Sequence, residues 1–548
     1  MPYVITQNCC IDASCVAVCP VDAIHPRPDE PEFLTTDMVY IDPQTCIDCG
    51  ACARACPVSA VYPEDDLPDR YRDYGQFNAD YFAAHGQWQP PAANGSTFNI
   101  VPTGARLRVA VVGSGPAGAY AAADLLARTE VDVEVDVYDR LLTPWGLVRS
   151  GVAPDHASTK SVTDQFEHIA DDPRFRFRLG VTIGSDVTVD ELAEHYHAVI
   201  VAVGASDDKP LGVPGEQLPG SFAATDFVAW YNGHPDHAGN TYDFASHRAV
   251  IVGNGNVALD AARILLTAPD ELAHTDIADH ALTALRASAI REVVIVGRRG
   301  PDQAAYTQPE LRALAHLNGV SVSVEGTEDV LTGPLAELVA RAATDQERGK
   351  RLIFRFLSVP TAILGDDRVQ GIRLAATEMH TAADGTISVT HAAQTDEIDT
   401  GLILRATGLR GRPLPGLPFD ETAQRIPSHS GRVFSLPERT PLPGVYVTGW
   451  IKRGASGMIG TNRQCARETV ESLLDDYRAH RLATRPVPTA DLDALLQRRN
   501  IIPVGLDGWR RLDASEKTAG ASANRTRRKF TSTAEQHAIA TAGRAAQA

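Results

Sequence analysis

The 548-residue chain is 44% hydrophobic and 22% charged, with a formal net charge of −18. This composition is typical of a water-soluble globular protein, the length predicts roughly three or four domains, and the negative charge argues against nucleic acid as the main partner. No run of about 18 uninterrupted apolar residues occurs, and the segment Met1–Asn8 lacks the basic and apolar parts of a secretory signal. We therefore expect no membrane partner and a cytoplasmic location.

Eight of the nine cysteines lie before residue 57 and the ninth is Cys465. Clustered cysteines without a secretory signal favour metal binding over a disulfide scaffold. Residues 46–57 follow the pattern C-x2-C-x2-C-x3-C-P, the spacing with which bacterial ferredoxins bind iron–sulfur clusters. A zinc site would need neither the third close cysteine nor the proline.

An earlier half-motif, C-C-x4-C-x3-C-P over residues 9–20, is less regular. It lacks the C-x2-C pair, so one ligand of a second cubane is missing. The segment resembles the seven-iron ferredoxins, which carry one 3Fe–4S and one 4Fe–4S cluster. This resemblance implies that the three-iron cluster is held by Cys9, Cys15 and Cys56. It implies that the four-iron cluster is held by Cys19, Cys46, Cys49 and Cys52.

The role of Cys10 is left open by this assignment. This residue is a spare thiol, the true ligand in place of Cys9, or a fourth ligand that would make a second 4Fe–4S cluster.

Residues 1–70 carry 12 acidic residues and 3 arginines, a formal charge of −9. Such a body is typical of an electron carrier that docks on a basic face, although plain solvation explains it equally. Residues 71–105 are polar and aromatic and contain two turn signals, so we expect a linker.

The main body begins at Arg106 with an apolar run into Gly-x-Gly-x-x-Gly over residues 113–118, a helical pattern and a second strand that ends on Asp139. The glycines allow the turn, the approach of the backbone to a pyrophosphate and the packing of helix on strand, while the acid meets a ribose hydroxyl. The pyrophosphate would lie at the helix N-terminus. The pattern predicts a dinucleotide site, with a glycine-rich structural turn as the alternative.

A second fingerprint spans residues 249–258, and its partner strand ends on Arg298-Arg299 without an acid. Two arginines at this tip favour a 2′-phosphate, so we expect NADP(H) rather than NAD; a solvated arginine pair is the alternative. Residues 268–290 are predicted to be a helical insertion. Residues 320–400 are expected to complete this domain with strands, and residues 402–408 to be a strand that returns to the first domain.

Residues 106–480, including the loop 141–156, resemble adrenodoxin reductase and its bacterial relatives, the glutathione-reductase-type ferredoxin–NADP⁺ reductases. Trp450 supports this narrower family, because many other two-dinucleotide flavoproteins have Asp there. Most members have Glu in place of Asp139 and Arg in place of Lys209; a lysine meets phosphate only as a point charge. His156 is a candidate proton relay beside the flavin, with a structural hydrogen-bonding residue as the alternative.

The fingerprint and the resemblance together imply a set of cofactor contacts. Those to FAD are Gly113, Gly115, Ala117, Gly118, Asp139, Leu147, Ile183, Trp450, Gly457, Met458 and Ile459. Those to NADP are Lys209, Asn254, Gly255, Asn256, Val257, Arg298, Arg299, Glu310 and Gly457.

We therefore predict an α/β protein with two Rossmann-like domains, for FAD and NADP, preceded by a small α+β ferredoxin-like iron–sulfur domain. The expected parts are a ferredoxin domain 1–70, a linker 71–105, a first FAD segment 106–206, an NADP domain 207–411, a second FAD segment 412–480 and a C-terminal extension 481–548. In the extension, Trp509 and Arg510 are expected to pack on the body. The basic run 525–529 is expected to be a solvated tail or to meet an acidic partner.

The expected function is that of a ferredoxin–NADP⁺ reductase. It would pass electrons from NADPH through FAD to the iron–sulfur clusters of a ferredoxin, fused or external, or in reverse. The expected partners are NADPH and ferredoxin-type or other one-electron acceptor proteins. One alternative is an electron-input subunit like the NADPH-oxidising small chain of glutamate synthase. The other is an iron–sulfur carrier or docking protein whose reductase half is not catalytic.

Overall fold

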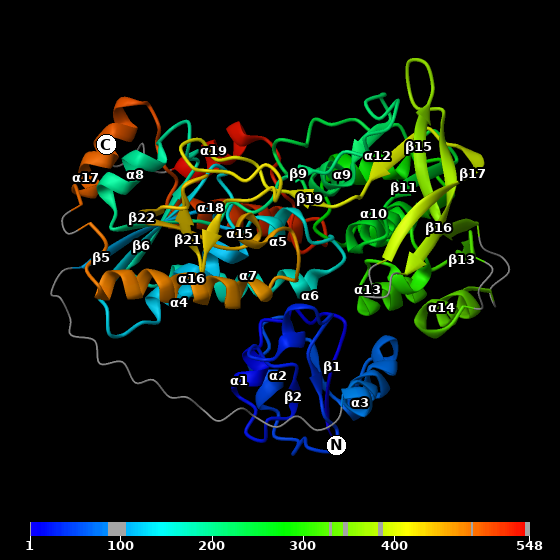
Figure 1. The fold of residues 1–548 in the computed structure, drawn as a ribbon, viewed down its shortest axis with the longest axis horizontal. Coiled ribbons are helices and arrows are strands. Elements are labelled where there is room, and N and C mark those ends of the chain that lie inside the picture. The colour runs from blue at the N-terminus through cyan, green and yellow to red at the C-terminus, as the bar shows by residue number, and fades with distance from the viewer. Residues whose placement is uncertain are drawn as a thin grey trace.

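The computed structural model describes residues 2–85, 106–327, 331–343, 349–381, 387–483 and 486–542. Figure 1 shows a small N-terminal domain, in dark blue, beneath two larger sheet domains that lie side by side. The mixed α/β architecture with two nucleotide-binding-type sheets agrees with the prediction. No helix of the described ranges is long and apolar enough to cross a bilayer.

The first sheet domain is built on a seven-stranded sheet in the order β20-β21-β22-β8-β5-β6-β7. The five strands from β22 to β7 are parallel. The central strands β5 and β8 are almost entirely apolar because helices cover both faces, whereas β6 carries Glu134 and Asp136 and β7 carries Arg176 and Arg178. The strands are β5 (Leu107–Val112), β6 (Val133–Asp139), β7 (Phe175–Leu179), β8 (Ala198–Val201), β20 (Ser428–His429), β21 (Arg432–Phe434) and β22 (Pro441–Val447). The helices are α4 (Pro116–Leu126), α5 (Leu147–Ser150), α6 (Ala157–Lys160), α7 (Val162–Ala170), α8 (Val189–His195), α15 (Trp450–Arg453) and α16 (Thr461–Arg478).

The second sheet domain has a six-stranded parallel sheet in the order β10-β18-β11-β12-β14-β13. The strands are β10 (Ser221–Ala223), β11 (Arg248–Val252), β12 (Glu292–Val296), β13 (Val320–Glu325), β14 (Lys350–Arg355) and β18 (Leu402–Arg405). A three-stranded antiparallel sheet adds β15 (Ser358–Leu364), β16 (Gly371–Thr381) and β17 (Ile387–Asp399). The helical segments are α9 (Ala224–Tyr231), α10 (Asn256–Leu266), α11 (Pro269–Leu272), α12 (Asp279–Arg286), η4 (Pro301–Gln303), α13 (Gln308–Ala313), η5 (Leu314–His316) and α14 (Gly333–Ala343).

Two sequence expectations for this domain have different outcomes. The helical insertion at 268–290 is present as α11 and α12. The strand expected to return to the first domain is instead β18, which pairs with β10 and β11 inside the second sheet. The crossing between the domains is made by β9 (Asp207–Asp208) and β19 (Leu409–Arg410), which pair antiparallel.

The N-terminal domain consists of two short antiparallel pairs and small helices. β1 (Tyr3–Ile5) pairs with β4 (Val61–Pro63), and β2 (Ile24–His25) pairs with β3 (Tyr40–Ile41). The helical segments are α1 (Ser14–Ala17), η1 (Pro31–Leu34), α2 (Ala51–Ala55), η2 (Glu64–Asp66), η3 (Asp69–Tyr71) and α3 (Asp73–His85).

Helix α3 occupies the first part of the segment that was expected to be a linker. Its Asn78 is buried, and the side-chain amide bonds the backbone N and O of Ile5 and the backbone N of Ile41. Tyr81 of the same helix stacks on Tyr40 with ring centroids 4.2 Å apart. The helix is therefore part of the N-terminal domain, and the rest of the expected linker, 86–105, lies outside the described residues.

The C-terminal extension forms α17 (Thr489–Arg498), α18 (Leu506–Ala521) and α19 (Thr533–Thr541). Trp509 is fully buried and donates a hydrogen bond to Glu167, as expected for a residue that packs on the body. The expectation of a solvated basic tail is wrong. Arg525 contacts Asp279 at 2.6 Å and Lys529 is buried 2.8 Å from Asp276, because both acids of the second sheet domain point at the run.

Candidate functional site

The first glycine fingerprint lies at the carboxyl end of β5 and opens α4. Gly113 has φ +108°, and a Cβ there would lie 2.4 Å from the carbonyl oxygen of Ala202, so only glycine fits this turn. No side chain caps the start of α4, which leaves its first backbone N–H groups directed at the turn. The Asp139 carboxylate reaches back to the same turn and accepts a hydrogen bond from the Ser114 N–H at 3.0 Å. Strand, turn, helix and acid therefore converge as a dinucleotide site requires.

The expected flavin-ring contacts lie on the loop that follows α15. Gly449 has φ +75°, and a Cβ there would lie 2.6 Å from the Cβ of Ala117, so this turn packs directly on the start of α4. Trp450 donates its indole N–H to the Ser456 carbonyl at 2.9 Å, which closes the loop before Gly457. The fingerprint and the loop around Trp450, far apart in sequence, are thus neighbours in space.

Other members of the expected FAD set occupy different environments. Leu147, at the start of α5, is 45% exposed although it is apolar. Met458 and Ile459 are half-buried on the loop before α16. Ile183 is buried and forms an isolated bridge with Val187. An apolar side chain left open at the end of a buried sheet is what a bound aromatic ring system would cover.

The second fingerprint repeats this geometry at the end of β11. Gly253 has φ +115°, and a Cβ there would lie 2.2 Å from the Ala406 carbonyl oxygen. Gly255 precedes α10, whose start again has no side-chain cap. Asn256 exchanges two hydrogen bonds with Thr307, which fixes the turn against the segment that leads to Glu310. Val257 is 36% exposed on the same turn.

The two arginines at the tip of β12 have the properties of an anion site. Their side chains make no ion pair to any acid among the described residues, and the Nε of Arg299 is buried without a hydrogen-bond partner. A buried guanidinium nitrogen without an acceptor is costly, and a phosphate group would satisfy it. Lys209 lies exposed on the β9–β19 crossing, where its backbone N–H donates to Gly408.

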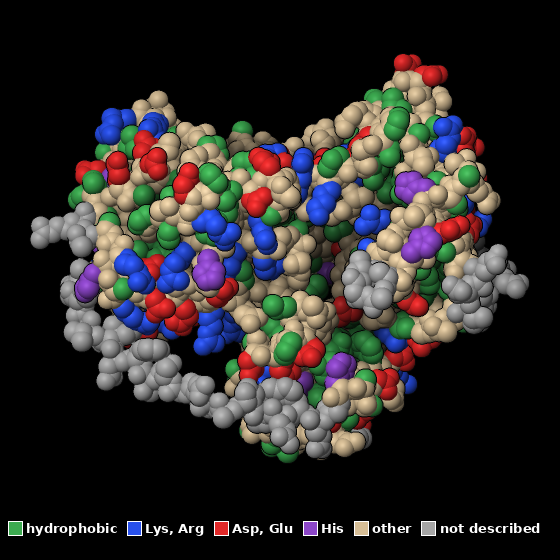
Figure 2. Space-filling model, viewed as in Figure 1, with side chains coloured by type: hydrophobic (Ala, Val, Ile, Leu, Met, Phe, Trp, Pro, Cys, Tyr) green, Lys and Arg blue, Asp and Glu red, His purple; other side chains and the backbone are tan. Residues whose placement is uncertain are grey.

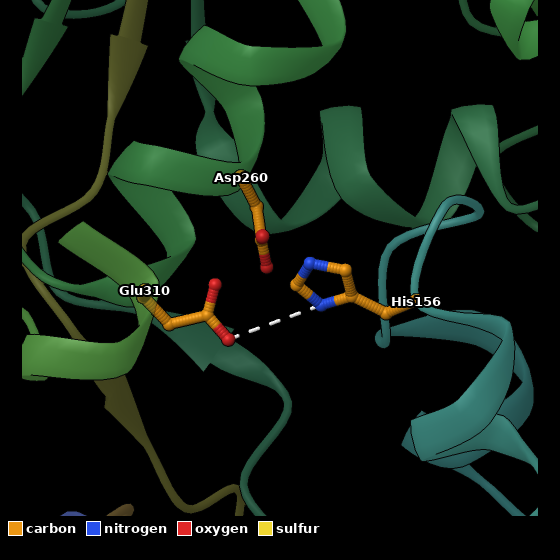
Figure 3. Close-up of side chains that lie close together, drawn as sticks. All are labelled: His156, Asp260 and Glu310. Atoms are coloured by element: carbon orange, nitrogen blue, oxygen red, sulfur yellow. Dashed lines mark ion pairs between the residues drawn. The ribbon is translucent and has the colours of Figure 1, made fainter. Parts of the chain in front are cut away.

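A cluster of three titratable side chains bridges the two sheet domains. His156 comes from the first domain and faces Glu310 and Asp260 of the second, as Figure 3 shows, with Nδ1 of His156 3.9 Å from Oε1 of Glu310. Burial raises the pKa of Glu310, and the nearby imidazole partly opposes this rise. His156 and Glu310 are separate candidates in the sequence, and the structure brings them together.

Asp260 was missed by the sequence analysis, although its position carried a signal. It lies four residues after Asn256 on α10 and therefore on the same face of that helix. Arg263 of the same helix bonds Asp260 within α10 and Asp155 across the domain boundary, so it stabilises this side of the junction. Val203, 38% exposed just after β8, is a second residue of the site region that the sequence did not single out.

Four cysteines of the N-terminal domain line one cavity, together with apolar residues such as Ile24 and Ile41. These cysteines are Cys19, Cys46, Cys49 and Cys52, the set predicted to hold the four-iron cluster. A cavity walled by four thiols and hydrocarbon matches the donor set of a cubane.

The other cysteines gather deeper in the domain. Cys9, Cys10 and Cys15 are buried, and Cys56 is half-buried. Burial raises the pKa of the Cys9 thiol to about 12 and that of the Cys15 thiol well above its ordinary range. Such thiols lose their protons when a metal binds them. All nine cysteines of the chain are free of disulfides.

The N-terminal domain rests on both sheet domains. On the first, the Gly460 N–H donates to the Cys10 carbonyl at 2.7 Å, and Arg463 donates to the Asp12 carbonyl at 3.0 Å. On the second, the Gln308 N–H donates to Asp37 at 2.8 Å. Figure 2 shows Lys and Arg side chains on the reductase-side surface along α16, beside the small domain. The contacts therefore combine one backbone-to-backbone hydrogen bond with hydrogen bonds between a charged side chain and a backbone group.

A family model described as pyridine nucleotide-disulphide oxidoreductase matches residues 107–455. Two models described as 4Fe-4S dicluster domains match residues 7–60 and 38–89. The second of these extends through helix α3, in agreement with its place in the N-terminal domain.

Curated relatives and solved structures show the same relationship. A "probable ferredoxin/ferredoxin--NADP reductase" of Mycobacterium tuberculosis is 46% identical, covering 99% of this chain and 95% of its own. The mitochondrial "NADPH:adrenodoxin oxidoreductase" of Arabidopsis thaliana is 40% identical, covering 77% of this chain and 93% of its own. A structure of Mycobacterium tuberculosis FprA in complex with NADPH, 44% identical, superposes with a TM-score of 0.74 over 80% of this chain and all of its own.

Proposed function

The chain belongs to the pyridine nucleotide-disulphide oxidoreductases, among the ferredoxin/ferredoxin–NADP reductases, and from this premise we propose that it passes electrons from NADPH through FAD to iron–sulfur clusters of its own N-terminal ferredoxin domain. When bound, FAD takes up a hydride from NADPH, and iron–sulfur clusters accept its electrons one at a time. One observation carries the proposal: the ferredoxin domain is already docked on the flavin-side loop, where Gly460 bonds Cys10.

For the nicotinamide cofactor, the proposal rests on Arg298 and Arg299. A 2′-phosphate would give the buried Nε of Arg299 the acceptor that it lacks. The uncapped N-terminus of α10 would receive the pyrophosphate. The remaining proposed contacts to NADP are Lys209, Asn254, Gly255, Asn256, Val257, Glu310 and Gly457.

For FAD, the proposal rests on the convergence of the first fingerprint with the loop around Trp450. The turn at Gly113 and the start of α4 would hold the pyrophosphate, and Asp139 the ribose. The exposed side chain of Leu147 would be covered by the ring system. The other proposed contacts are Gly115, Ala117, Gly118, Ile183, Gly457, Met458 and Ile459.

His156 and Glu310 are proposed to hold the proton that accompanies flavin chemistry. Nδ1 of the imidazole and Oε1 of the carboxyl face each other at 3.9 Å, close enough for one water or a small movement to join them. Burial raises the pKa of Glu310, so this carboxyl keeps its proton to higher pH than an exposed glutamate does. The pair is contributed by two domains, so it is complete only when the domains are closed on each other.

For the clusters, we propose that the cavity thiols Cys19, Cys46, Cys49 and Cys52 hold a 4Fe–4S cluster. The buried set of Cys9, Cys15 and Cys56 is proposed to hold a 3Fe–4S cluster, with Cys10 as a spare thiol. The missing C-x2-C pair in the first half-motif supports the three-iron assignment. The free state of all nine cysteines supports a reducing, cytoplasmic location.

The test is an anaerobic titration of the full chain with NADPH, followed by absorption and EPR. We expect the flavin and iron–sulfur bands to bleach together, and the oxidised protein to contain seven irons and a three-iron EPR signal. Cys10→Ser should keep both clusters, whereas Cys15→Ser should lose the three-iron centre. Flavin bleaching with clusters that stay oxidised would refute the route, while eight irons and a silent oxidised spectrum would refute only the three-iron assignment.

A further inference from the structure

The two cysteine sets of the ferredoxin domain lie in different positions relative to the reductase. The loop that carries Cys9, Cys10 and Cys15 is pressed against the reductase loop around Gly460. The cavity of the other set opens elsewhere, and its Cys49 is exposed. We therefore call Cys9, Cys15 and Cys56 the inner set, and Cys19, Cys46, Cys49 and Cys52 the outer set.

The contact at the inner set is close enough to be backbone against backbone. A Cβ on Gly460 would lie 2.2 Å from the backbone of Ile11 and Asp12, so a side chain there would separate the two surfaces. Arg463 binds the same loop through two hydrogen bonds, donating to the Asp12 carbonyl at 3.0 Å and to the Ser14 hydroxyl at 2.8 Å. The inner set is thereby fixed beside Met458 and Ile459, the proposed neighbours of the flavin ring.

The outer set takes no part in this contact. Across the described ranges, the hydrogen bonds and ion pairs between ferredoxin domain and reductase involve no residue that lines the outer cavity. Instead, two apolar side chains next to its cysteines face solvent. Ile47, beside Cys46, is 57% exposed, and Val18, beside Cys19, is 42% exposed.

We infer that the outer set is the electron exit, and that the surface formed by Val18, Ile47 and Cys49 docks an external one-electron acceptor protein. This inference rests on the proposed function. Electrons pass in turn from the nicotinamide site to the flavin site, the inner cysteines, the outer cysteines and the exit surface. One NADPH then reduces two acceptor molecules in two dockings, and NADP⁺ and one proton are released.

Charge indicates the kind of partner. The ferredoxin domain carries a formal −9 over residues 1–70, and two of its 12 acids, Asp12 and Asp37, accept hydrogen bonds from the reductase. The domain therefore stays strongly negative, and one of its exposed acids, Asp48, directly follows Ile47 in the chain. The matching partner is a protein whose redox centre lies beneath an apolar patch ringed by Lys and Arg.

The test uses the full-length holoprotein and cytochrome c, a basic haem protein, as the acceptor probe. Ile47→Lys should raise the KM for cytochrome c at least about fivefold by removing apolar contact and adding like charge. Ile502→Lys is the matched control, because Ile502 is also 57% exposed but lies in the C-terminal extension. NADPH-driven bleaching of the protein's own clusters, without acceptor, should be unchanged in both variants.

Unchanged cytochrome c kinetics in Ile47→Lys, with iron content and EPR intact, would overturn the exit surface. If that variant loses iron, Val18→Lys is measured in its place with the same expectation. The order in which the two cysteine sets are reduced has a separate test. Cys49→Ser should still allow NADPH to bleach the inner centre, whereas in Cys15→Ser the outer centre should be reduced by dithionite but not by NADPH on the turnover timescale. Rapid reduction of the outer centre by NADPH in Cys15→Ser would overturn the order, whereas wild-type clusters that never bleach would instead refute the proposed function.

Discussion

At the scale of single residues, we expect Arg298 and Arg299 to decide the choice of nicotinamide cofactor. Their side chains have no acid to pair with among the described residues, so a 2′-phosphate is their natural partner. Replacing both by alanine removes charge-assisted contacts worth about 1.5–3 kcal/mol each. We expect the KM for NADPH to rise steeply while that for NADH stays unchanged.

Steady-state kinetics with both cofactors measure this directly. Arg286→Ala is the control, since Arg286 is exposed on α12 and its one ion-pair partner in the described part of the chain is the exposed Asp270. Equal losses with NADPH and NADH in the double variant would refute the assignment of NADP.

The buried carboxyl of Glu310 makes a prediction about stability and pH. Its folded pKa is raised by burial, so the folded chain keeps this proton to higher pH than the unfolded chain does. The free energy of unfolding therefore falls as the pH rises from the ordinary value of about 4.3 through the raised folded value, and the loss persists above it. Glu310→Gln removes this loss and should raise the free energy of unfolding at pH 8.

Chemical denaturation of the cofactor-free protein across pH checks this expectation. The advantage of Glu310→Gln should shrink as the pH falls and vanish below about pH 4.3. Glu438→Gln, a change on an exposed loop, should show no such profile. A Glu310→Gln variant that is less stable than the wild type at pH 8 would contradict the role of burial.

At the scale of elements, the sequence predicted those parts of the fold whose pattern is local. The units β5–α4–β6 and β11–α10–β12 follow from apolar strands, glycine turns and the residues at the strand tips. Helix α3 was not predicted because its stability comes from a distant contact, the Asn78 amide on β1 and β3. The packing of residues 525–529 on the body was not predicted for the same reason. The acids that pair with this run, Asp276 and Asp279, lie about 250 positions earlier in the chain.

Helix α18 anchors the C-terminal extension through one buried acid. Glu516 is fully buried and bonds Arg149 of the first sheet domain at 2.6 Å and Arg527 at 2.7 Å. Burial alone would raise the pKa of Glu516, but the two arginines outweigh it and lower the pKa. Its stabilising contribution is therefore present above the ordinary pKa and lost as the pH falls through the lowered one.

Glu516→Ala leaves the half-buried Arg149 without its ion-pair partner and leaves the half-buried Arg527 with Asp513 alone. We expect the free energy of unfolding to fall by about 3–5 kcal/mol, measured by urea denaturation at pH 7.5. Asp507→Ala, on an exposed position of the same helix, should change it by less than about 0.5 kcal/mol. Comparable effects of the two variants would show that the extension is not anchored through Glu516.

The loop around Gly460 is the element that joins reductase and ferredoxin. Gly460→Ala places a methyl group where the backbone of Ile11 and Asp12 lies, although its φ of −72° is open to any residue. We expect NADPH-driven cluster reduction to slow about tenfold, equivalent to about 1.4 kcal/mol in the barrier, while flavin reduction keeps its rate. Rapid mixing with NADPH separates the two phases.

Gly505→Ala is the control for this substitution. Gly505 also has an ordinary φ, −88°, and a Cβ there would meet nothing within 4 Å. If Gly460→Ala and Gly505→Ala reduce their clusters at the same rate, the contact at Gly460 is not the point of electron entry.

At the scale of the whole molecule, the ferredoxin domain and the reductase form one assembled unit, because the domain is docked on the reductase by direct contacts. The ferredoxin domain touches both sheet domains, at Gly460 of the first and at Gln308 of the second. Most of these hydrogen bonds pair a side chain with a backbone group, and the arginines of the ion pairs Arg341–Asp73 and Arg463–Asp12 are exposed. Exposed ion pairs contribute little and are screened by salt, so ionic strength should hardly affect the docked state.

The most direct measurement of this claim is stopped-flow mixing of the full-length protein with NADPH under anaerobic conditions. The flavin band should bleach first and the iron–sulfur bands next. The rate of the second phase should not change over a tenfold range of protein concentration, nor between ionic strengths of about 0.05 M and 0.5 M. A second phase that accelerates in proportion to protein concentration, or clusters that stay oxidised while the flavin bleaches, would contradict the account.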